Sequence, residues 1–365
     1  MDAPLARLID QVQTARAAKG ALHIRGGGSK AFYGEPARDG DALLDTRELA
    51  GISAYEPSEL VVTVRAGTPL AEVEAALAER GQHLAFEPPR FDGHSGTVGG
   101  MVAAGLSGPA RAAVGGVRDF VLGATILNGK AEVLSFGGQV MKNVAGYDVS
   151  RLLTGSMGIL GVICELSLKV LPLPTAQTTL RFDASEPKAL AQLNAWGAQP
   201  LPITASAWWA GTLVVRLAGA AAAVAQATRT LGGEVLPAEL AQPFWAGLRD
   251  QRDEFFVHAA AGVANASAAL WRASVPSTAP ALALPGEQLI EWGGAQRWWL
   301  TAAPATVVRA AAGAVGGHAT LFRAADKSAG VFTPLPPALA RIHQQMKQAF
   351  DPDRVFNPGR LYPDL

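Results

Sequence analysis

The hydrophobic pattern of the N-terminal part of the chain switches between strand-like and helix-like segments. The run from Glu59 to Arg65 (ELVVTVR) is rich in β-branched residues and predicts a strand. From Leu70 to Leu77 apolar side chains recur at helical spacing, and Gly81 ends this pattern, so the stretch predicts a helix. Together with the apolar pair at 85 and 86, these segments predict a β-α-β unit.

Two later patterns predict further strands. Residues 119–136 (DFVLGATILNGKAEVLSF) hold two apolar runs joined by Asn128-Gly129, a dipeptide favoured in tight hairpins. From Val162 to Val170 apolar and polar positions alternate, which is typical of a half-buried strand. Cys164 falls on the apolar side of this alternation, so we expect a core residue rather than a reactive thiol.

The pattern changes after Pro172 and Pro174, where alanine-rich sequence begins that carries all eight tryptophans. A weak internal repeat follows. Its first copy has a strand near 207–216, a helix at 218–231, a glycine pair and a strand at 234–236. Its second copy has a strand at 297–301, a helix at 304–315, another glycine pair and a strand at 318–323. Two strand-helix-strand copies predict an α+β cap domain. After a predicted helix at 339–349, the tail FDPDRVFNPGRLYP is expected to dock back on the first domain.

Length and composition limit the classes of function. A chain of 365 residues is long enough for at least two domains. Lysine plus arginine equals aspartate plus glutamate at 31 each, which argues against nucleic acid as a partner. The single cysteine excludes an internal disulfide framework and a four-thiolate iron–sulfur site in this chain. The N-terminus resembles a helix rather than a signal peptide, and no long apolar run occurs, so we expect a soluble cytoplasmic protein, with any membrane contact peripheral.

Two glycine-rich stretches carry the strongest candidate chemistry. The first is IRGGGSKAFYG at 24–34, and the second begins with GTVGG at 96–100. Glycine lets a backbone approach a flat or phosphorylated ligand closely, so the pair predicts one large cofactor held between two loops. The first stretch also fits a Rossmann fingerprint, with Asp45 as the acidic residue. However, FYGEPARDGD breaks the helix which that fold requires, and this argues against it. Structural turns without a ligand remain an alternative.

Longer motifs give a specific resemblance. The strand ending in RGGGS, the GTVGG loop, and V-A-G-Y-D followed by G-S-x-G-x-L-G-V-I resemble the FAD-binding domain of the vanillyl-alcohol oxidase and para-cresol methylhydroxylase superfamily. More narrowly, FEPP, GGVRDFVLGATILNGK, KNVAGYDVSRL, EWGGAQRWW and FDPDRVFNPGRLYP are similar to the family of FAD-binding E subunits of bacterial glycolate oxidase. This similarity extends over nearly the whole chain.

The resemblance implies an α+β protein. An FAD-binding domain of the para-cresol methylhydroxylase (PCMH) type would occupy residues 1–174. It would consist of two subdomains, at about 1–90 and 91–174. A smaller ferredoxin-like α+β cap would follow at 175–330, and residues 331–365 would return to the FAD domain.

The resemblance also implies which residues hold the cofactor. Backbone amides of the first loop would bind the pyrophosphate, GTVGG would form the second wall, and the third block would pass along the flavin and adenine. The implied cofactor-binding residues are Arg25, Gly26, Gly27, Gly28, Ser29, Lys30, Pro89, Gly96, Thr97, Val98, Gly99, Gly100, Ser107, Gly155, Ser156, Gly158, Gly161 and Ile163. The first loop lacks the histidine that often attaches FAD covalently in this superfamily, so the FAD is expected to be non-covalent. His23 is expected to be a strand residue, and His94 lies near the second loop.

Catalysis is less clearly encoded. Oxidation of a 2-hydroxy acid requires a hydride acceptor, a cation for the carboxylate and a base for the hydroxyl proton. In the cap, Arg297, His318, Arg323 and Lys327 are the candidates for the cation and the base. Ion pairs for the arginines and a plain strand position for His318 are the competing interpretation. Related catalytic subunits carry a second histidine and an acidic residue that GGHATLFRA lacks.

Two classes of function follow from the resemblance. The first is an FAD-binding subunit of a heteromeric glycolate oxidase, working with a catalytic FAD subunit and an iron–sulfur subunit. The second is a self-sufficient flavoenzyme, either a dehydrogenase of 2-hydroxy acids or a reductase like the UDP-N-acetylenolpyruvoylglucosamine enzyme. A structural subunit that has lost the flavin is a further alternative. No metal site is expected.

Overall fold

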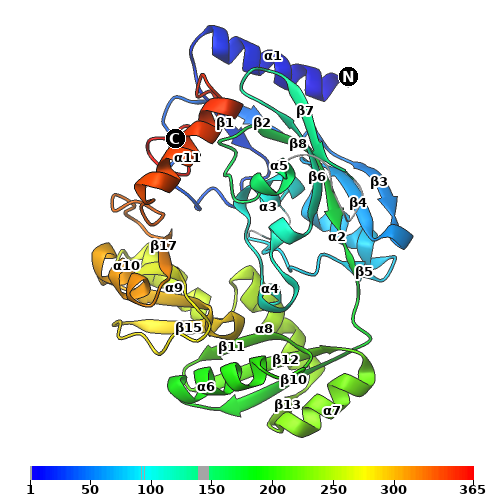
Figure 1. Ribbon diagram of the computed structural model, residues 1–365, viewed down its shortest axis with the longest axis vertical. Helices are drawn as coiled ribbons and strands as arrows, with labels where there is room; N and C mark the ends of the chain where they lie inside the picture. Colours follow the sequence, from blue (N-terminus) through cyan, green and yellow to red (C-terminus); the bar gives the residue numbers. More distant parts are fainter. Residues whose placement is uncertain (1, 92, 94, 139–147) are drawn as a thin grey trace. The chain divides into compact units, whose positions relative to one another are not determined.

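The computed structural model describes residues 2–91, 93, 95–138 and 148–365, and it divides into two compact units (Figure 1). The first unit comprises Met1–Leu106, Gly116–Pro172 and Pro334–Leu365, and the second comprises Ser107–Gly115 and Leu173–Thr333. The sequence-based boundaries placed residues 107–115 in the FAD domain, and this assignment is wrong. The segment packs on the second unit, where the indole Nε1 of Trp292 donates to the Gly108 carbonyl over 3.0 Å.

The first unit begins with a parallel pair of strands, β1 (Leu22–Arg25) and β2 (Ala42–Asp45). Residues 26–41, between the two strands, form turns and bends with no helix. The Rossmann alternative is therefore wrong, because that fold places a helix between these strands. On its other edge β1 pairs with the tail, through a parallel bridge between Leu22 and Phe356.

The first unit also contains a five-stranded antiparallel sheet. Its order is β3 (Ile52–Glu56), β4 (Val61–Arg65), β8 (Val162–Lys169), β6 (Val121–Leu127) and β7 (Val133–Gly137). The predicted strands and the hairpin that joins β6 to β7 at Asn128-Gly129 are confirmed, but the turn is longer than a two-residue turn. The connection runs from 128 to 132, because the Asn128 side chain accepts hydrogen bonds from the amides of Lys130 and Glu132, each over 2.9 Å, and so stabilises a longer loop.

Helices and short strands complete the first unit. They are α1 (Ala3–Ala17), η1 (Pro57–Glu59), α2 (Leu70–Ala78), β5 (Gln82–His83), α3 (Val98–Ala104), η2 (Val117–Asp119), α5 (Val149–Leu152), β9 (Leu171–Pro172) and α11 (Pro337–Phe350). One core cluster joins α1 to the sheets and the tail through Leu8, Leu44, Cys164 and Phe356. Burial raises the pKa of the Cys164 thiol to about 12, which confirms the prediction of an unreactive core residue.

The second unit is built on one antiparallel sheet. Its order is β13 (Glu234–Leu236), β10 (Ala176–Asp183), β12 (Thr212–Gly219), β11 (Ile203–Trp209), β15 (Glu287–Glu291), β16 (Gln296–Thr301), β14 (Ala269–Ser274) and β17 (His318–Arg323). The first four strands have the ferredoxin-like order, and the last four have the same order reversed across the sheet. The two halves are joined by the pairing of β11 with β15. The predicted repeat is thus confirmed. The single strand expected at 207–216 is instead a hairpin that turns at Ala210 and Gly211, both with positive φ.

Helices cover both faces of this sheet. They are α4 (Arg111–Val114), α6 (Glu186–Gly197), α7 (Ala221–Leu231), α8 (Ala238–Asp250), α9 (Glu254–Ala264) and α10 (Ala305–Ala314), with the short turn η3 (Trp292–Gly294). Apolar positions of α6 and α7 pack on the first half and those of α10 on the second half. The other face of the sheet is covered by α8 and α9. There Trp245 of α8 donates a hydrogen bond to Thr179 of β10, and the ring of Phe256 of α9 contacts Trp298 of β16. None of the helices in the described ranges is long and apolar enough to cross a membrane.

Candidate flavin site

The first glycine loop starts where β1 ends at Arg25, and it lies directly against the second glycine loop. A Cβ atom added to Gly26 would overlap the Thr97 hydroxyl, and one added to Gly27 would overlap the carbonyl oxygen of Ser95. Gly28 has a φ of 77°, in the left-handed region that favours glycine. These glycines are therefore required for two backbones to approach each other closely.

The backbone amides of this loop form a concentrated set of donors. No residue in the described part of the chain accepts a hydrogen bond from the amides of Gly26, Gly27, Gly28 or Ser29. Strand amides nearby are satisfied, since Ile24 donates to the Asn357 side chain over 2.8 Å. Successive amides without protein acceptors are typical of an anion-binding nest, and they fit a pyrophosphate.

The second glycine loop is used differently. The amide of Val98 donates to Thr68 O over 3.0 Å, and that of Gly99 donates to Ala66 O over 2.7 Å. The Gly100 amide donates to the Thr97 side chain, which caps α3. A Cβ on Gly99 would lie 2.7 Å from that of Ala66. Val98 and Gly99 therefore dock α3 against the end of β4, and their place beside the cofactor stays a prediction.

The third glycine block also supports the site from behind. The amides of Gly155 and Met157 donate to carbonyls of Val102 and Ala103 in α3, which brings Met157 beside that helix. A Cβ on Gly158 would lie 2.7 Å from the Asn357 amide nitrogen. Of the predicted cofactor residues, Pro89, Gly96, Val98, Gly99, Ser107, Gly155, Ser156, Gly158, Gly161 and Ile163 do not line the pocket described next. His94 and most of the VAGYD motif lie outside the described residues.

One pocket collects the remaining predicted residues. From the prediction it contains Arg25, Gly26, Gly27, Gly28, Ser29, Lys30, Thr97 and Gly100. The lining residues that sequence reasoning missed are His23, Ile24, Ala31, Ala103, Ala104, Met157, Asn357 and Arg360. Asn357 and Arg360 belong to the FNPGR motif of the tail. The docking of the tail on this unit was predicted from the sequence, but its contribution to this pocket was not.

The electrostatics of the pocket favour an anion. Among the described residues, the lining includes the cations Arg25, Lys30 and Arg360 and no carboxylate. The Lys30 ammonium lies 3.5 Å from the Ser29 hydroxyl and 5.9 Å from the centre of the Phe91 ring. Burial, with Arg360 and Arg25 nearby, lowers the pKa of His23, so this imidazole is neutral at pH 7. These three cations would favour an anion such as a pyrophosphate.

The structure does not bring the predicted catalytic residues together. Arg297 is fully buried, and its guanidinium donates to the carbonyls of Gly294, Pro280 and Ala279 over 3.1, 2.6 and 2.6 Å. With its donors directed at these carbonyls, Arg297 secures a loop and cannot grip a substrate carboxylate, so its predicted role is corrected.

His318 and Arg323 occupy opposite ends of β17, about 16 Å apart at about 3.3 Å per residue. The strand register also places His318 and Arg297 at alternate positions, on opposite faces of the sheet. These three side chains therefore do not form one site. In the described ranges, no group of three or more His, Cys, Asp or Glu side chains is placed to hold a metal ion.

Comparisons with known proteins agree with this geometry. The FAD binding domain family matches residues 5–137. Over 358 residues the chain is 48% identical to glycolate oxidase subunit GlcE of Escherichia coli (strain K12), which covers 98% of this chain and 97% of that protein. The chain belongs to the GlcE family. Its first unit thus carries an FAD-binding domain, with the amide nest of Gly26 to Ser29 inside the matched range.

More distant relatives match less than half of this GlcE-family chain. Glycolate oxidase subunit GlcD of Bacillus subtilis (strain 168) is 29% identical over 43% of this chain and 33% of that protein. D-lactate dehydrogenase of Anaerostipes hadrus is 33% identical over 39% of this chain and 29% of that protein. Solved structures of alkyldihydroxyacetonephosphate synthase match 96% of this chain and 75% of theirs with a TM-score of 0.62 at 14% identity, which shows a common fold.

Proposed function

We propose that this chain is the FAD-binding subunit of a multi-subunit glycolate oxidase that converts glycolate to glyoxylate. The observation that carries the proposal is the amide nest at Gly26 to Ser29, in a cationic pocket, within a chain similar to glycolate oxidase subunit GlcE over nearly its full length. The expected partners are a catalytic FAD subunit and an iron–sulfur subunit, and the expected location is the cytoplasm, with any membrane contact made through those partners.

The roles of this chain's own residues follow from the pocket. The amides of Gly26, Gly27, Gly28 and Ser29 would hold the pyrophosphate, and Arg25 and Lys30 would balance its charge. Thr97 and Gly100 would line the pocket opposite the first glycine loop, and the neutral imidazole of His23 would line it beside β1. A bound FAD would supply the acceptor for the two electrons that leave a 2-hydroxy acid as hydride.

Substrate chemistry is proposed to depend on the partners. The buried Arg297 and the separated His318 and Arg323 do not assemble a carboxylate grip with a base, as a self-sufficient dehydrogenase would require. His318 and Arg323 remain candidates for a role at the partner's site.

The test is to purify the chain alone, measure its flavin absorbance, and add glycolate without oxygen, with and without the co-expressed partner subunits. The proposal expects FAD that acid precipitation releases intact, and bleaching only when the partners are present. Bleaching of the isolated chain by glycolate would favour the self-sufficient enzyme instead. A colourless chain that cannot be reconstituted with FAD would contradict both and leave a structural subunit.

A further inference from the structure

The C-terminal tail contributes two almost fully buried side chains to the flavin pocket, Asn357 and Arg360. The Asn357 side chain accepts a hydrogen bond from the amide of Ile24 over 2.8 Å and donates to Met157 O over 2.7 Å. Its own amide donates to Leu22 O over 3.0 Å. One side chain thus ties the end of β1, which leads into the amide nest, to the Met157 wall of the pocket.

Arg360 performs the same function for the chain that follows the nest. Its guanidinium donates to the carbonyls of Ala31 and Tyr33 over 2.8 and 2.6 Å, and to that of Glu35. Its own carbonyl accepts from the Glu35 amide over 3.0 Å. A planar fork can satisfy several carbonyls of a tight turn at once, whereas an ammonium cannot hold the same geometry. Arg360 therefore fixes the turns at 31–35.

The amide nest lies between these two attachments. Its upstream end is held at Ile24 by Asn357, and its downstream end is held at Ala31 by Arg360. Glycine-rich backbone has more conformational freedom than any other, so a nest of glycine amides keeps its direction only if both ends are fixed. A preorganised set of donors binds an anion more tightly than one that must first be ordered.

We propose that Asn357 and Arg360 are positioning residues for the cofactor: they hold both ends of the glycine loop so that its amides converge on the pyrophosphate. This inference rests on the proposed role of those amides and adds the tail, which lies outside residues 5–137, to the cofactor site. Loss of either side chain should weaken FAD binding even where the pocket's charge is unchanged.

Two variants separate positioning from charge and from folding. Arg360→Lys keeps the positive charge and removes the fork. Asn357→Gly removes both side-chain hydrogen bonds, and glycine tolerates the φ of 43° at this position. The matched control is Arg341→Lys, the same chemical change at an exposed position of α11. The dissociation constant of FAD is measured by titrating each apoprotein. Amide hydrogen exchange is measured without FAD at Ile24, Ala31, Tyr33 and Glu35, whose amides have acceptors in the protein.

Both variants should bind FAD about tenfold more weakly or worse, which is the effect of losing roughly one hydrogen bond between the loop amides and the charged pyrophosphate. Both should also exchange the amides of Ile24, Ala31, Tyr33 and Glu35 faster. The control should match the wild-type protein in both measurements. If Arg360→Lys does not fold, Asn357→Gly decides the outcome. Wild-type affinity and wild-type exchange in a folded variant would overturn the inference. A wild-type chain that binds no FAD would instead contradict the proposed function, while the exchange measurement would still test whether the tail orders the loop.

Discussion

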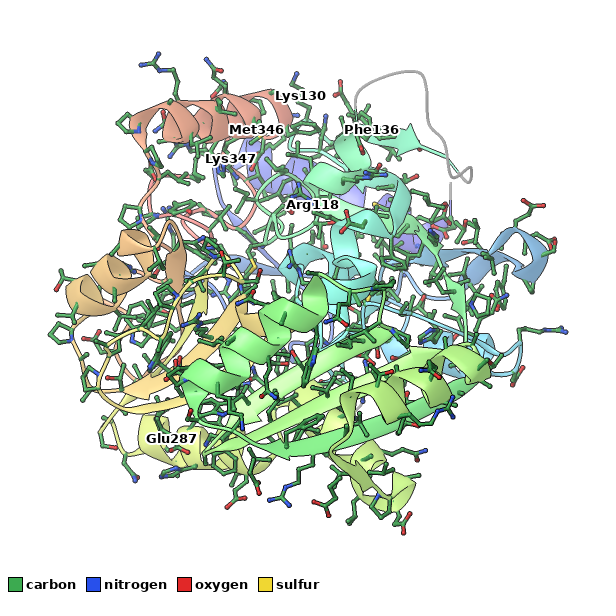
Figure 2. The ribbon with its side chains drawn as sticks, turned by 60° about the horizontal axis from the view of Figure 1, so that its bottom comes forward. Arg118, Lys130, Phe136, Glu287, Met346 and Lys347 are labelled. Atoms are coloured by element: carbon green, nitrogen blue, oxygen red, sulfur yellow. The ribbon has the colours of Figure 1, made fainter. Side chains whose placement is uncertain are left out.

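The ammonium of Lys347 lies 2.7 Å from the carboxylate of Asp351, one helical turn away, and both side chains are buried. Lys347 lies on α11 beside Met346 (Figure 2) and also donates to Ile159 O and Phe356 O, each over 2.8 Å. Asp351 in turn accepts from the amides of Val355 and Phe356, over 2.9 and 2.8 Å. This ion pair anchors the tail that reaches the pocket lined by the first glycine loop.

Replacing Lys347 with methionine should destabilise the first unit by about 3–5 kcal/mol, because it leaves the Asp351 charge buried without a partner. The double variant with Asp351→Asn should lose less than the sum of the two single changes, since it removes both charges together. Urea unfolding of the three variants measures this coupling. Additive losses would show that the two groups stabilise the tail independently.

Replacing Gly27 with alanine should abolish FAD retention, because the new methyl group would overlap the Ser95 carbonyl and separate the two loops. The matched change Gly20→Ala, where the added carbon would lie 3.8 Å from the nearest oxygen, should leave flavin content unchanged. Flavin absorbance relative to protein absorbance measures both. A fully loaded Gly27→Ala protein would refute the close contact of the loops.

Replacing Trp292 with phenylalanine should loosen the segment at 107–115. The change removes the donor to Gly108 O and keeps an aromatic ring near the Arg111 guanidinium, which lies 4.6 Å from the indole. The expected loss is about 1 kcal/mol, the contribution of one hydrogen bond. Hydrogen exchange should accelerate within 107–115 more than in the sheet strands of the second unit, and uniform acceleration would contradict a local role.

Asp253 should make the second unit more stable at acidic pH. Burial raises its pKa to about 6, while the side chain accepts from the Phe256 amide as the N-cap of α9. Because the folded pKa exceeds the ordinary value of 3.8, the folded state binds the extra proton between these values. This contribution is complete below about pH 4 and is lost as the pH rises through about 6.

Asp253→Asn keeps the capping oxygen and removes the charge. It should therefore be more stable than the wild-type protein by about 1–3 kcal/mol at pH 8, with the difference shrinking towards pH 4. Urea unfolding at pH 8 and pH 5 measures the change. An equal difference at both pH values would mean that the ionisation of Asp253 does not contribute.

The sequence by itself determined the local elements and the repeat. The strands at 61–65 and 162–169, the helix from Leu70 and the core position of Cys164 follow from side-chain periodicity, which depends on neighbours a few residues apart. The motifs also identified the two glycine loops and the family, because similarity of sequence over nearly the whole chain can be detected without any knowledge of contacts.

Only the tertiary structure decided what each glycine does. The amides of Gly26 to Ser29 and those of Val98 and Gly99 look alike in sequence, yet the latter are satisfied by Thr68 and Ala66. Likewise, Asn357 meets Ile24 across 333 residues of chain, and Arg297 meets the carbonyls of a loop rather than a substrate. Whether a polar group faces a ligand or the protein depends on which distant backbone satisfies it, and local periodicity carries no information about such long-range hydrogen bonds.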